Sequence, residues 1–254
     1  MYTIAVFNNQ KDAGKTAITI NLGHALALAG HQVTLVDFDP AGDLSAGLGL
    51  FRQPTQGIDQ VLLEALDMES VAISTRNELH LLPAGVRLGE LEQEHGQTGI
   101  QRGLLLQQAL ARGMVDQEFM IFDCPSRSGL LTANALLGVD MALMPVTGDE
   151  VGAAGLPHLL ETVRRFGASR GRALDYAVLM NRIPSRRRLT GAAASKFSSL
   201  APGHFLKSVI CQSDLINESR SIGRTVFEYR PSSRSVADFR QLARELLMRV
   251  RQGG

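Results

Sequence analysis

The stretch Ile4-Ala-Val-Phe-Asn-Asn-Gln-Lys-Asp-Ala-Gly-Lys-Thr-Ala-Ile-Thr-Ile-Asn-Leu22 contains an apolar run, a polar segment and a second apolar run. This order predicts a strand, a loop and a helix. In a phosphate-binding loop that ends in Gly-Lys-Thr, backbone N–H groups and the helix N-terminus surround phosphate oxygens. Lys15 would then reach the outer phosphates, and the Thr16 hydroxyl would bind Mg²⁺. Gly14 lets the backbone approach the anion, although Asn9 stands where such loops usually have their first glycine. The sequence therefore predicts a phosphate-binding site after the first strand.

Two further apolar runs end in carboxylates. Val33–Val36 is followed by Asp37 and Asp39, and Phe119–Phe122 is followed by Asp123. An apolar run that ends in an acid is typical of a buried parallel strand whose carboxyl end faces a ligand crevice. The alternation of such strands with helical segments predicts an α/β fold, in which helices flank a doubly wound, mostly parallel sheet. Three strand ends are expected to converge on one phosphate site.

These motifs resemble the ParA/MinD family of deviant Walker A ATPases, and within it the ParA-like partition and positioning branch. Residues 37–49 (DFDPAGDLSAGLG) resemble the switch I segment of that branch, and residues 123–136 (DCPSRSGLLTANAL) resemble its Walker B and switch II segments. Leu215 to Tyr229, with Glu218 and Gly223, is similar to the late segment of the family, which precedes a docking C-terminal helix. The resemblance covers nearly the whole chain.

The resemblance implies a P-loop ATPase that binds ATP and Mg²⁺. Asp39 would orient or deprotonate the attacking water, Asp123 would hold Mg²⁺ through a water, and Asp37 would order the outer shell of the metal. Asn181, at the end of the strand predicted for 176–180, is the candidate that reads adenine, with a simple turn asparagine as the alternative. The implied site residues are, for catalysis, Lys15, Asp39 and Lys11; for the nucleotide, Asn9, Gln10, Lys11, Asp12, Ala13, Gly14, Lys15, Thr16, Ala17 and Asn181; and for the metal, Thr16, Asp39 and Asp123.

The chain departs from the family in its phosphate loop. The signature lysine of the family lies five residues before the Walker lysine and contacts the nucleotide of the partner subunit, but Gln10 occupies that position here. Lys11 and Asp12 replace the two glycines that usually follow. We expect Lys11 to substitute for the signature lysine; Arg127 on the switch II loop, or no residue at all, are the alternatives.

Composition limits the domain organisation and the compartment. The chain has 254 residues, 44% of them hydrophobic, which is enough for a sizeable core, and the order of elements favours one ATPase domain over residues 1–254. A hydrophobic run of membrane-spanning length and a basic, then apolar, leader are both missing from the sequence. We therefore expect a cytoplasmic protein, associated with the nucleoid when ATP is bound. Two cysteines are too few for a disulfide framework and lack metal-ligand spacing.

Charge is distributed unevenly along the chain. Residues 182–254 contain fourteen Lys or Arg and five Asp or Glu, a net charge of +9, whereas residues 1–181 carry −8. A basic C-terminal third indicates an anionic partner such as nonspecific DNA or a membrane surface, and a solvated arginine-rich face is the alternative. The candidate DNA-binding residues are Arg186, Arg187, Arg188, Arg220 and Arg224.

Four functions compete on these observations. The first is a partition or positioning switch that forms an ATP-dependent homodimer, binds DNA, and hydrolyses ATP slowly under stimulation by a cargo-adaptor protein. The second is a membrane-associated regulator of the MinD type, for which the helix predicted over 236–250 would be the surface element; docking of this helix on the sheet is favoured. The third is a metabolic P-loop enzyme, and the fourth an iron–sulfur carrier, which Cys124 without a spaced partner disfavours. The sequence does not identify the cargo.

Overall fold

A computed structural model describes residues 1–93, 102–114, 116–127, 129–171, 173–184, 197 and 199–253. The strands in these ranges are β1 (Tyr2–Val6), β2 (Val33–Asp37), β3 (Ile73–Arg76), β4 (Leu79–Leu82), β5 (Phe119–Asp123), β6 (Met141–Thr147), β7 (Asp175–Ile183) and β8 (Phe205–Cys211). The helices are α1 (Lys15–Ala27), α2 (Asp43–Gly47), α3 (Ile58–Leu63), α4 (Met68–Val71), α5 (Glu90–Gln93), α7 (Leu105–Arg112), α8 (Leu130–Gly138), α9 (Glu150–Ser169), α11 (Asp214–Ser221), α12 (Val226–Tyr229) and α13 (Arg234–Gly253).

The described strands form one eight-stranded sheet in the order β3-β4-β2-β5-β1-β6-β7-β8. Every neighbouring pair is parallel except β3 and β4, so the predicted α/β fold with a mostly parallel sheet is confirmed. Strand β5 lies between β1 and β2, and its Asp123 is in register with Val6 on one side and Asp37 on the other. The predicted convergence of three strand ends is therefore confirmed.

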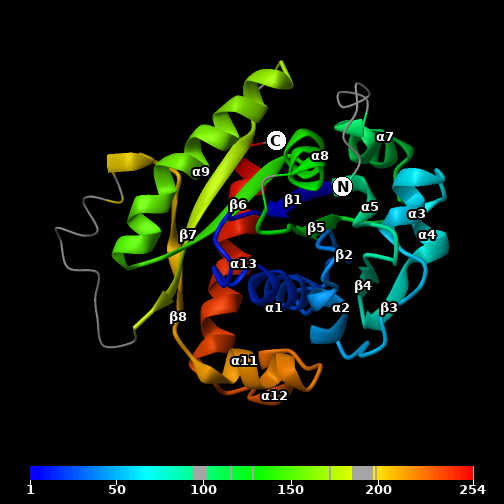
Figure 1. Ribbon diagram of the computed structural model, residues 1–254. Coiled ribbons are helices and arrows are strands. Elements are labelled where there is room, and N and C mark those ends of the chain that lie inside the picture. The colour runs from blue at the N-terminus through cyan, green and yellow to red at the C-terminus, as the bar shows by residue number, and fades with distance from the viewer. Residues whose placement is uncertain are drawn as a thin grey trace.

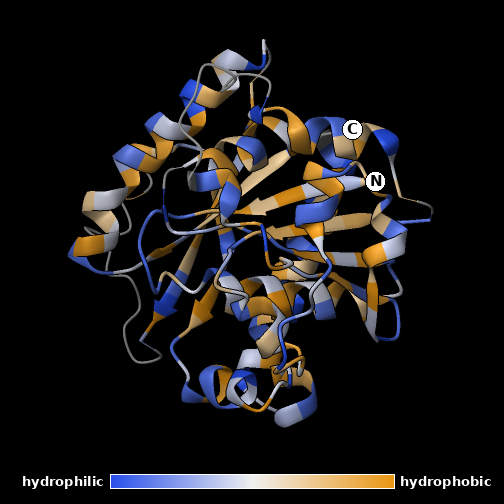
Figure 2. Ribbon diagram, turned by 45° about the vertical axis from the view of Figure 1, so that its right-hand side comes forward, coloured by the Kyte–Doolittle hydropathy of each residue, from blue (hydrophilic) through white to orange (hydrophobic). Residues whose placement is uncertain are grey.

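Helices cover both faces of the sheet (Figure 1). On one face, α1 and α13 pack over the apolar side chains of β1, β2, β5 and β7. On the other face, α3, α7, α8 and α9 cover the alternate side chains of the same strands. Figure 2 shows mostly hydrophobic strands in the interior and, around them, helices along which hydrophobic and hydrophilic residues alternate. Burial on both faces explains why the strands read as continuous apolar runs in the sequence.

Helix α13 docks on the sheet, as the sequence favoured. Its Val236, Phe239, Leu242 and Leu246 are buried in the core that also contains Ile18 of α1. The apolar face that a membrane-surface helix would need is therefore covered by the protein itself. In the part of the chain that the structure describes, no helix combines the length and the hydrophobicity required to cross a membrane.

Replacing Leu242 with alanine should lower the free energy of unfolding by about 2 to 5 kcal/mol, because this side chain of α13 is fully buried against the sheet. Urea unfolding monitored by circular dichroism measures this change. Leu28→Ala is the matched control, since Leu28 is 58% exposed at the end of α1 and should change stability by less than about 0.5 kcal/mol. Equal effects of the two substitutions would show that α13 is not held in the core.

Several short elements correct the sequence prediction. Residues 45–57 contain glycine and proline and predict a loop, but α2 covers Asp43–Gly47. The sequence also predicts a loop through Arg220 and Arg224, where the structure has α11 and α12, and it does not predict the edge strand β3. The pattern of residues 100–111 predicts an amphipathic helix, whereas the structure has a turn at residues 103 and 104, and α7 begins at Leu105. Elements of four to eight residues show too little periodicity to be predicted from sequence, because tertiary contacts determine them.

Candidate nucleotide-binding site

The loop between β1 and α1 has the geometry of a phosphate cradle. Gly14, immediately before the helix, has φ 88°, a left-handed conformation that L side chains rarely adopt. A Cβ at this position would collide with the side chain of Asn181. The carbonyl of Gly14 accepts a hydrogen bond from Ile18 N (2.9 Å), which starts the helix. The first N–H groups of α1 therefore point into the loop, where they can bind an anion.

Lys15 lies across this loop and is largely buried. Its Nζ donates to the carbonyl of Gln10 (3.2 Å) and to Ser126 Oγ (2.7 Å) on the loop after β5. Burial lowers the pKa of Lys15, and the nearby Asp123 opposes that shift. Since both hydrogen-bond acceptors are neutral, an incoming phosphate would give the buried ammonium a counter-charge that these contacts do not provide.

Two buried carboxylates meet beside the lysine. Asp37 and Asp123 are adjacent in register, and Oδ1 of each is buried without a hydrogen-bond partner among the described residues. Burial raises the pKa of both groups, and the charge of Asp37 raises that of Asp123 further. The Thr16 side chain hydrogen-bonds to Asp123. Orphaned oxygen atoms of this kind suit a divalent cation, whose charge would stabilise both carboxylates.

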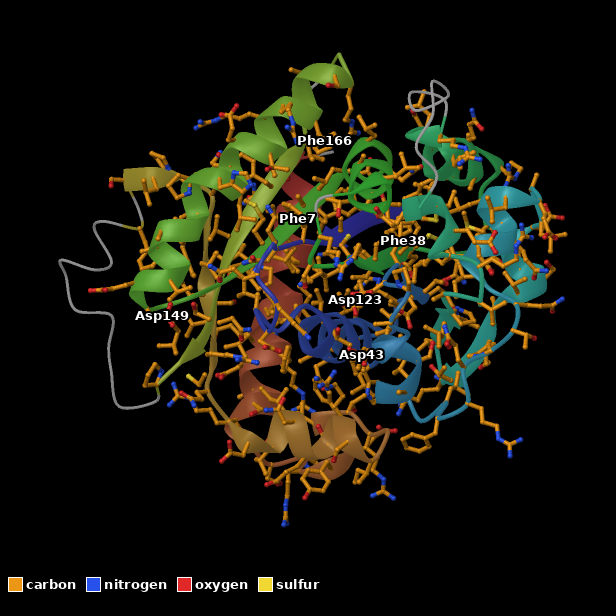
Figure 3. The ribbon with its side chains drawn as sticks, in the orientation of Figure 1. Phe7, Phe38, Asp43, Asp123, Asp149 and Phe166 are labelled. Carbon is orange, nitrogen blue, oxygen red and sulfur yellow. The ribbon has the colours of Figure 1, made fainter. Side chains whose placement is uncertain are left out.

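The donor set matches Mg²⁺ rather than a metal held entirely by protein. In the described ranges, no three His, Cys, Asp or Glu side chains gather closely enough to form a metal site on their own. Mg²⁺ typically takes one or two protein oxygens and completes its shell with water and phosphate oxygens. Thr16 and Asp123 can supply those protein oxygens. Figure 3 shows Asp123 between Phe7 and Phe38 on one side and Asp43 of α2 on the other, in the middle of the molecule.

The switch I residues lie beside this pair. Asp37 Oδ2 accepts hydrogen bonds from Ser45 N (3.1 Å) and Ser45 Oγ (3.0 Å), which ties α2 to the end of β2. Asp39 lies two residues beyond the strand, partly exposed, and its Oδ1 accepts from Ala41 N (3.1 Å). The negative charge of Asp39 acts to raise the pKa of both Lys15 and Asp123. The structure therefore brings Asp39 next to the phosphate loop, as expected.

The remaining loop residues differ in exposure. Gln10 is half-buried and turns toward α9, where its Nε2 donates to the carbonyl of Val151 (3.0 Å). Lys11 and Asp12 are exposed at the tip, and Asp12 has φ 66°, where the family has glycine. No described residue forms a hydrogen bond or ion pair with the Lys11 side chain. The other loop positions named from the sequence, all in the loop or the first turn of α1, are Asn9, Ala13 and Ala17.

Asn181 lies at the edge of a small cavity on the far side of the loop. Its Nδ2 donates to the carbonyl of Ala13 (2.7 Å), so one amide donor supports the phosphate loop. The cavity, of about 130 Å³, is lined by Gly14 and Ala17 of the phosphate loop and helix and by residues between Cys211 and Asn217. Asn181 is thus placed where a group attached to the phosphates could reach it.

Switch II contains two contacts that the sequence did not reveal. The carboxylate of Glu92 accepts hydrogen bonds from Leu130 N (3.2 Å) and Leu131 N (2.9 Å), and so caps the N-terminus of α8. Ser126 binds Lys15, as described above. No local pattern marks a cap that arrives from a residue 38 positions away. Arg127 is exposed on the same loop, and its guanidinium has no described partner.

Only part of the predicted basic surface can be located. Arg220 is in α11, where its side-chain stem lies over Gly47 of α2, and Arg224 is exposed in the turn before α12. Both belong to the region below α1 in Figure 1. Arg186, Arg187 and Arg188 lie outside the described residues.

Comparisons with known proteins agree with this geometry. The family model described as an AAA domain (AAA_31) matches residues 1–175. The chain is 31% identical over 251 residues to the chromosome-partitioning ATPase Soj of Treponema pallidum, covering 96% of each chain. It is 30% identical over 253 residues to the chromosome partitioning protein ParA of Caulobacter vibrioides, covering 98% of this chain and 94% of that one.

One solved structure with the same fold carries a nucleotide. Cobyrinic acid a,c-diamide synthase from Mycobacterium smegmatis, with bound ADP and magnesium, superimposes with a TM-score of 0.80 at 24% identity, covering 100% of this chain and 97% of that one. Fold, site and sequence likeness together define a P-loop ATPase. The chain belongs to the ParA/Soj/MinD family of deviant Walker A ATPases.

Proposed function

We propose that this protein is a ParA-like ATPase that binds ATP and Mg²⁺, forms an ATP-dependent homodimer, binds DNA without sequence preference, and hydrolyses ATP slowly to partition or position a cargo. The observation that carries the proposal is the meeting of Lys15, Asp39 and the buried Asp37–Asp123 pair at three adjacent strand ends. The names of the relatives, which describe chromosome partitioning, support the cellular role. A separate cargo adaptor that stimulates hydrolysis is part of this proposal.

In the proposed reaction, the chain acts mainly by positioning. The loop amides and Lys15 would bind the outer phosphates, Thr16 and Asp123 would hold Mg²⁺, and Asp39 would orient the attacking water. Bound Mg²⁺ would neutralise phosphate charge. Asn181 and the cavity beside it would receive the adenine, because a side-chain amide can both donate to and accept from the edge of the ring.

In the proposed homodimer, a cation of each subunit would contact the nucleotide phosphates of its partner, as the signature lysine of the family does. Gln10 does not supply one, and its amide is held in its own chain by Val151. Lys11 is exposed, adjacent to this position and without a described partner, so we assign it the role. Arg127 is the second choice. Asp12, the residue after Lys11, has a left-handed backbone conformation and turns the loop tip as a glycine would, because Asp adopts positive φ more readily than most residues.

Lys11→Ala should weaken the ATP-bound dimer about tenfold or more while ATP affinity of the monomer stays within about twofold, because a charge-assisted phosphate contact is lost only across the interface. Analytical ultracentrifugation with a slowly hydrolysed ATP analogue measures this. Arg127→Ala, prepared in parallel, tests the alternative cation. An unchanged dimer dissociation constant in Lys11→Ala would show that Lys11 does not contact the phosphates of the partner subunit.

DNA is favoured over a membrane surface by two observations. The apolar face of α13 is buried, so it is not available to a membrane surface. Of the acids close in sequence to Arg220 and Arg224, Glu228 is neutralised by its ion pair with Arg76, which leaves the charge of the two arginines available to a polyanion such as DNA. The metabolic alternative is weaker, because the cavities of about 520 and 560 Å³ lie by Thr3 and Tyr2, at the other ends of the strands from the phosphate loop.

Reversing two charges, Arg220→Glu with Arg224→Glu, should weaken binding of the ATP-loaded protein to arbitrary duplex DNA at least about tenfold. It should also reduce the slope of log affinity against log salt by roughly two, since each neutralised phosphate contributes about 0.9. Arg164→Glu with Arg165→Glu on exposed α9 is the matched control of equal charge. Co-sedimentation with anionic vesicles is the parallel arm. Equal losses in both variants, or vesicle binding without DNA binding, would contradict the DNA surface.

A further inference from the structure

Arg76, the last residue of edge strand β3, joins two segments that are far apart in the sequence. Its side chain is only 13% exposed. One terminal nitrogen donates to the carbonyl of Leu48 (3.3 Å), just after α2, and the other to the carbonyl of Gly223 (3.0 Å), in the turn between α11 and α12. Glu228 of α12 accepts from Nε (2.9 Å) and from the second terminal nitrogen (3.0 Å). A single guanidinium therefore connects β3, the end of α2 and the α11–α12 turn.

The Leu48 contact leads back to the phosphate site. Helix α2 is held at Ser45 by two hydrogen bonds to Asp37, the carboxylate that lies beside Asp123. Leu48 N in turn donates to the carbonyls of Leu44 (3.1 Å) and Ser45 (3.2 Å). A displacement of Asp37 on binding nucleotide and metal can therefore reach, through Ser45 and α2, the Leu48 carbonyl that Arg76 binds.

The Gly223 contact leads to the basic surface. Gly223 N donates to the carbonyl of Arg220 (3.0 Å), and Arg224 N donates to the carbonyl of Ser219 (2.9 Å), so both arginines belong to the turn that Arg76 holds. The backbones of Gly49 and Gly223 touch directly: a Cβ on Gly223 would collide with Gly49. The two segments are thus packed without an intervening side chain, and a shift of one displaces the other.

The opposite side of this turn is fixed to the phosphate-loop helix. Asn21 Oδ1 of α1 accepts from Val226 N (2.9 Å), and the His24 Nδ1 lies 2.7 Å from Thr225 Oγ1. Burial lowers the pKa of His24 to about 4, so the ring is neutral at physiological pH and this contact is an ordinary hydrogen bond. The turn therefore lies between α1, whose N-terminus would bind the nucleotide, and α2, whose Ser45 contacts Asp37.

We propose that Arg76 is a positioning residue that couples the Asp37–Ser45 contact, beside the nucleotide site, to the segment Ser219–Tyr229. Through this coupling, the identity of the bound nucleotide sets the conformation of the surface that contains Arg220 and Arg224. The coupling between the nucleotide site and residues 219–229 rests on the proposed binding of ATP. Its effect on DNA affinity rests, in addition, on the proposed DNA-binding surface. Arginine is required because its planar fork donates to two carbonyls and a carboxylate at once, whereas lysine has a single nitrogen.

Hydrogen exchange on the full chain, loaded with ADP or with a slowly hydrolysed ATP analogue, tests the proposal. In the wild type, amides of residues 219–229 should exchange at rates that differ about tenfold between the two nucleotides. In Arg76→Met and Arg76→Lys this difference should fall below about twofold. Protection of residues 14–20 by either nucleotide should remain in both variants, which shows that the fold and the nucleotide site are intact.

Arg249→Met is the matched control, because Arg249 also donates to a carboxylate and a carbonyl, those of Asp175 and Tyr176, away from the phosphate loop. It should retain the wild-type difference. The proposal is overturned if Arg76→Met keeps the difference in exchange rate between the two nucleotides at residues 219–229. It is also overturned if the wild type shows no such difference although nucleotide protects its residues 14–20. If Arg76→Met abolishes the difference but the wild type binds no DNA with either nucleotide, the coupling is supported and the DNA function is rejected.

Discussion

Replacing Lys15 with alanine is expected to weaken ATP binding by about 100-fold or more. Its ammonium is the buried cation at the mouth of the phosphate loop, and hydrogen bonds to charged groups contribute roughly 1.5 to 3 kcal/mol each. Without nucleotide the variant should have a stability close to that of the wild type, because the removal of a buried charge offsets the loss of the hydrogen bonds to Ser126 and the Gln10 carbonyl and of the attraction to Asp123.

Isothermal titration calorimetry with ATP and Mg²⁺ measures the first effect, and thermal unfolding without nucleotide measures the second. Lys207→Ala, which removes an exposed lysine from β8, is the control and should change neither quantity. Unchanged ATP affinity in Lys15→Ala would mean that this loop does not hold the phosphates.

The second large effect is expected at Asp39. Asp39→Ala should retain ATP affinity within about threefold and lose hydrolysis by about 100-fold or more, the usual contribution of a residue that positions or deprotonates the nucleophile. The reason for the separation is structural: Asp39 is partly exposed beyond β2, whereas Lys15, Thr16 and the loop amides hold the phosphates.

Single-turnover hydrolysis, measured beside nucleotide affinity, distinguishes the two effects. Asp43→Ala is the matched control, because Asp43 is an exposed aspartate in the same segment, at the first position of α2. Hydrolysis at the wild-type rate in Asp39→Ala would overturn the assignment of switch I and leave the phosphate loop assignment intact.

The sequence predicted the parts of the site that depend on strand order. Apolar runs ending at Asp37 and Asp123 were sufficient, because parallel strands align their carboxyl ends and the register follows from burial on both faces. The loop from Asn9 to Thr16 was equally readable, since its chemistry is local. Lys11 and Asp12 were recognised as departures, and the structure places them at the exposed tip.

The sequence did not predict contacts that only the tertiary fold creates. Arg76, Glu92 and Ser126 reach their partners across long separations, and no local pattern marks them. One missed element did leave a signal: Thr225-Val-Phe-Glu228 is a capping box, and the structure shows both of its hydrogen bonds at the start of α12. That pattern would have predicted a helix where a loop was expected.

In the proposed function, the bound nucleotide controls whether the protein binds DNA. The most direct measurement is the equilibrium affinity of the wild-type protein for one arbitrary duplex at fixed salt, with a slowly hydrolysed ATP analogue, with ADP, and without nucleotide. We predict binding with the analogue that is at least about tenfold tighter than in the other two states. Equal affinity in all three states, or no binding in any of them, would contradict the account.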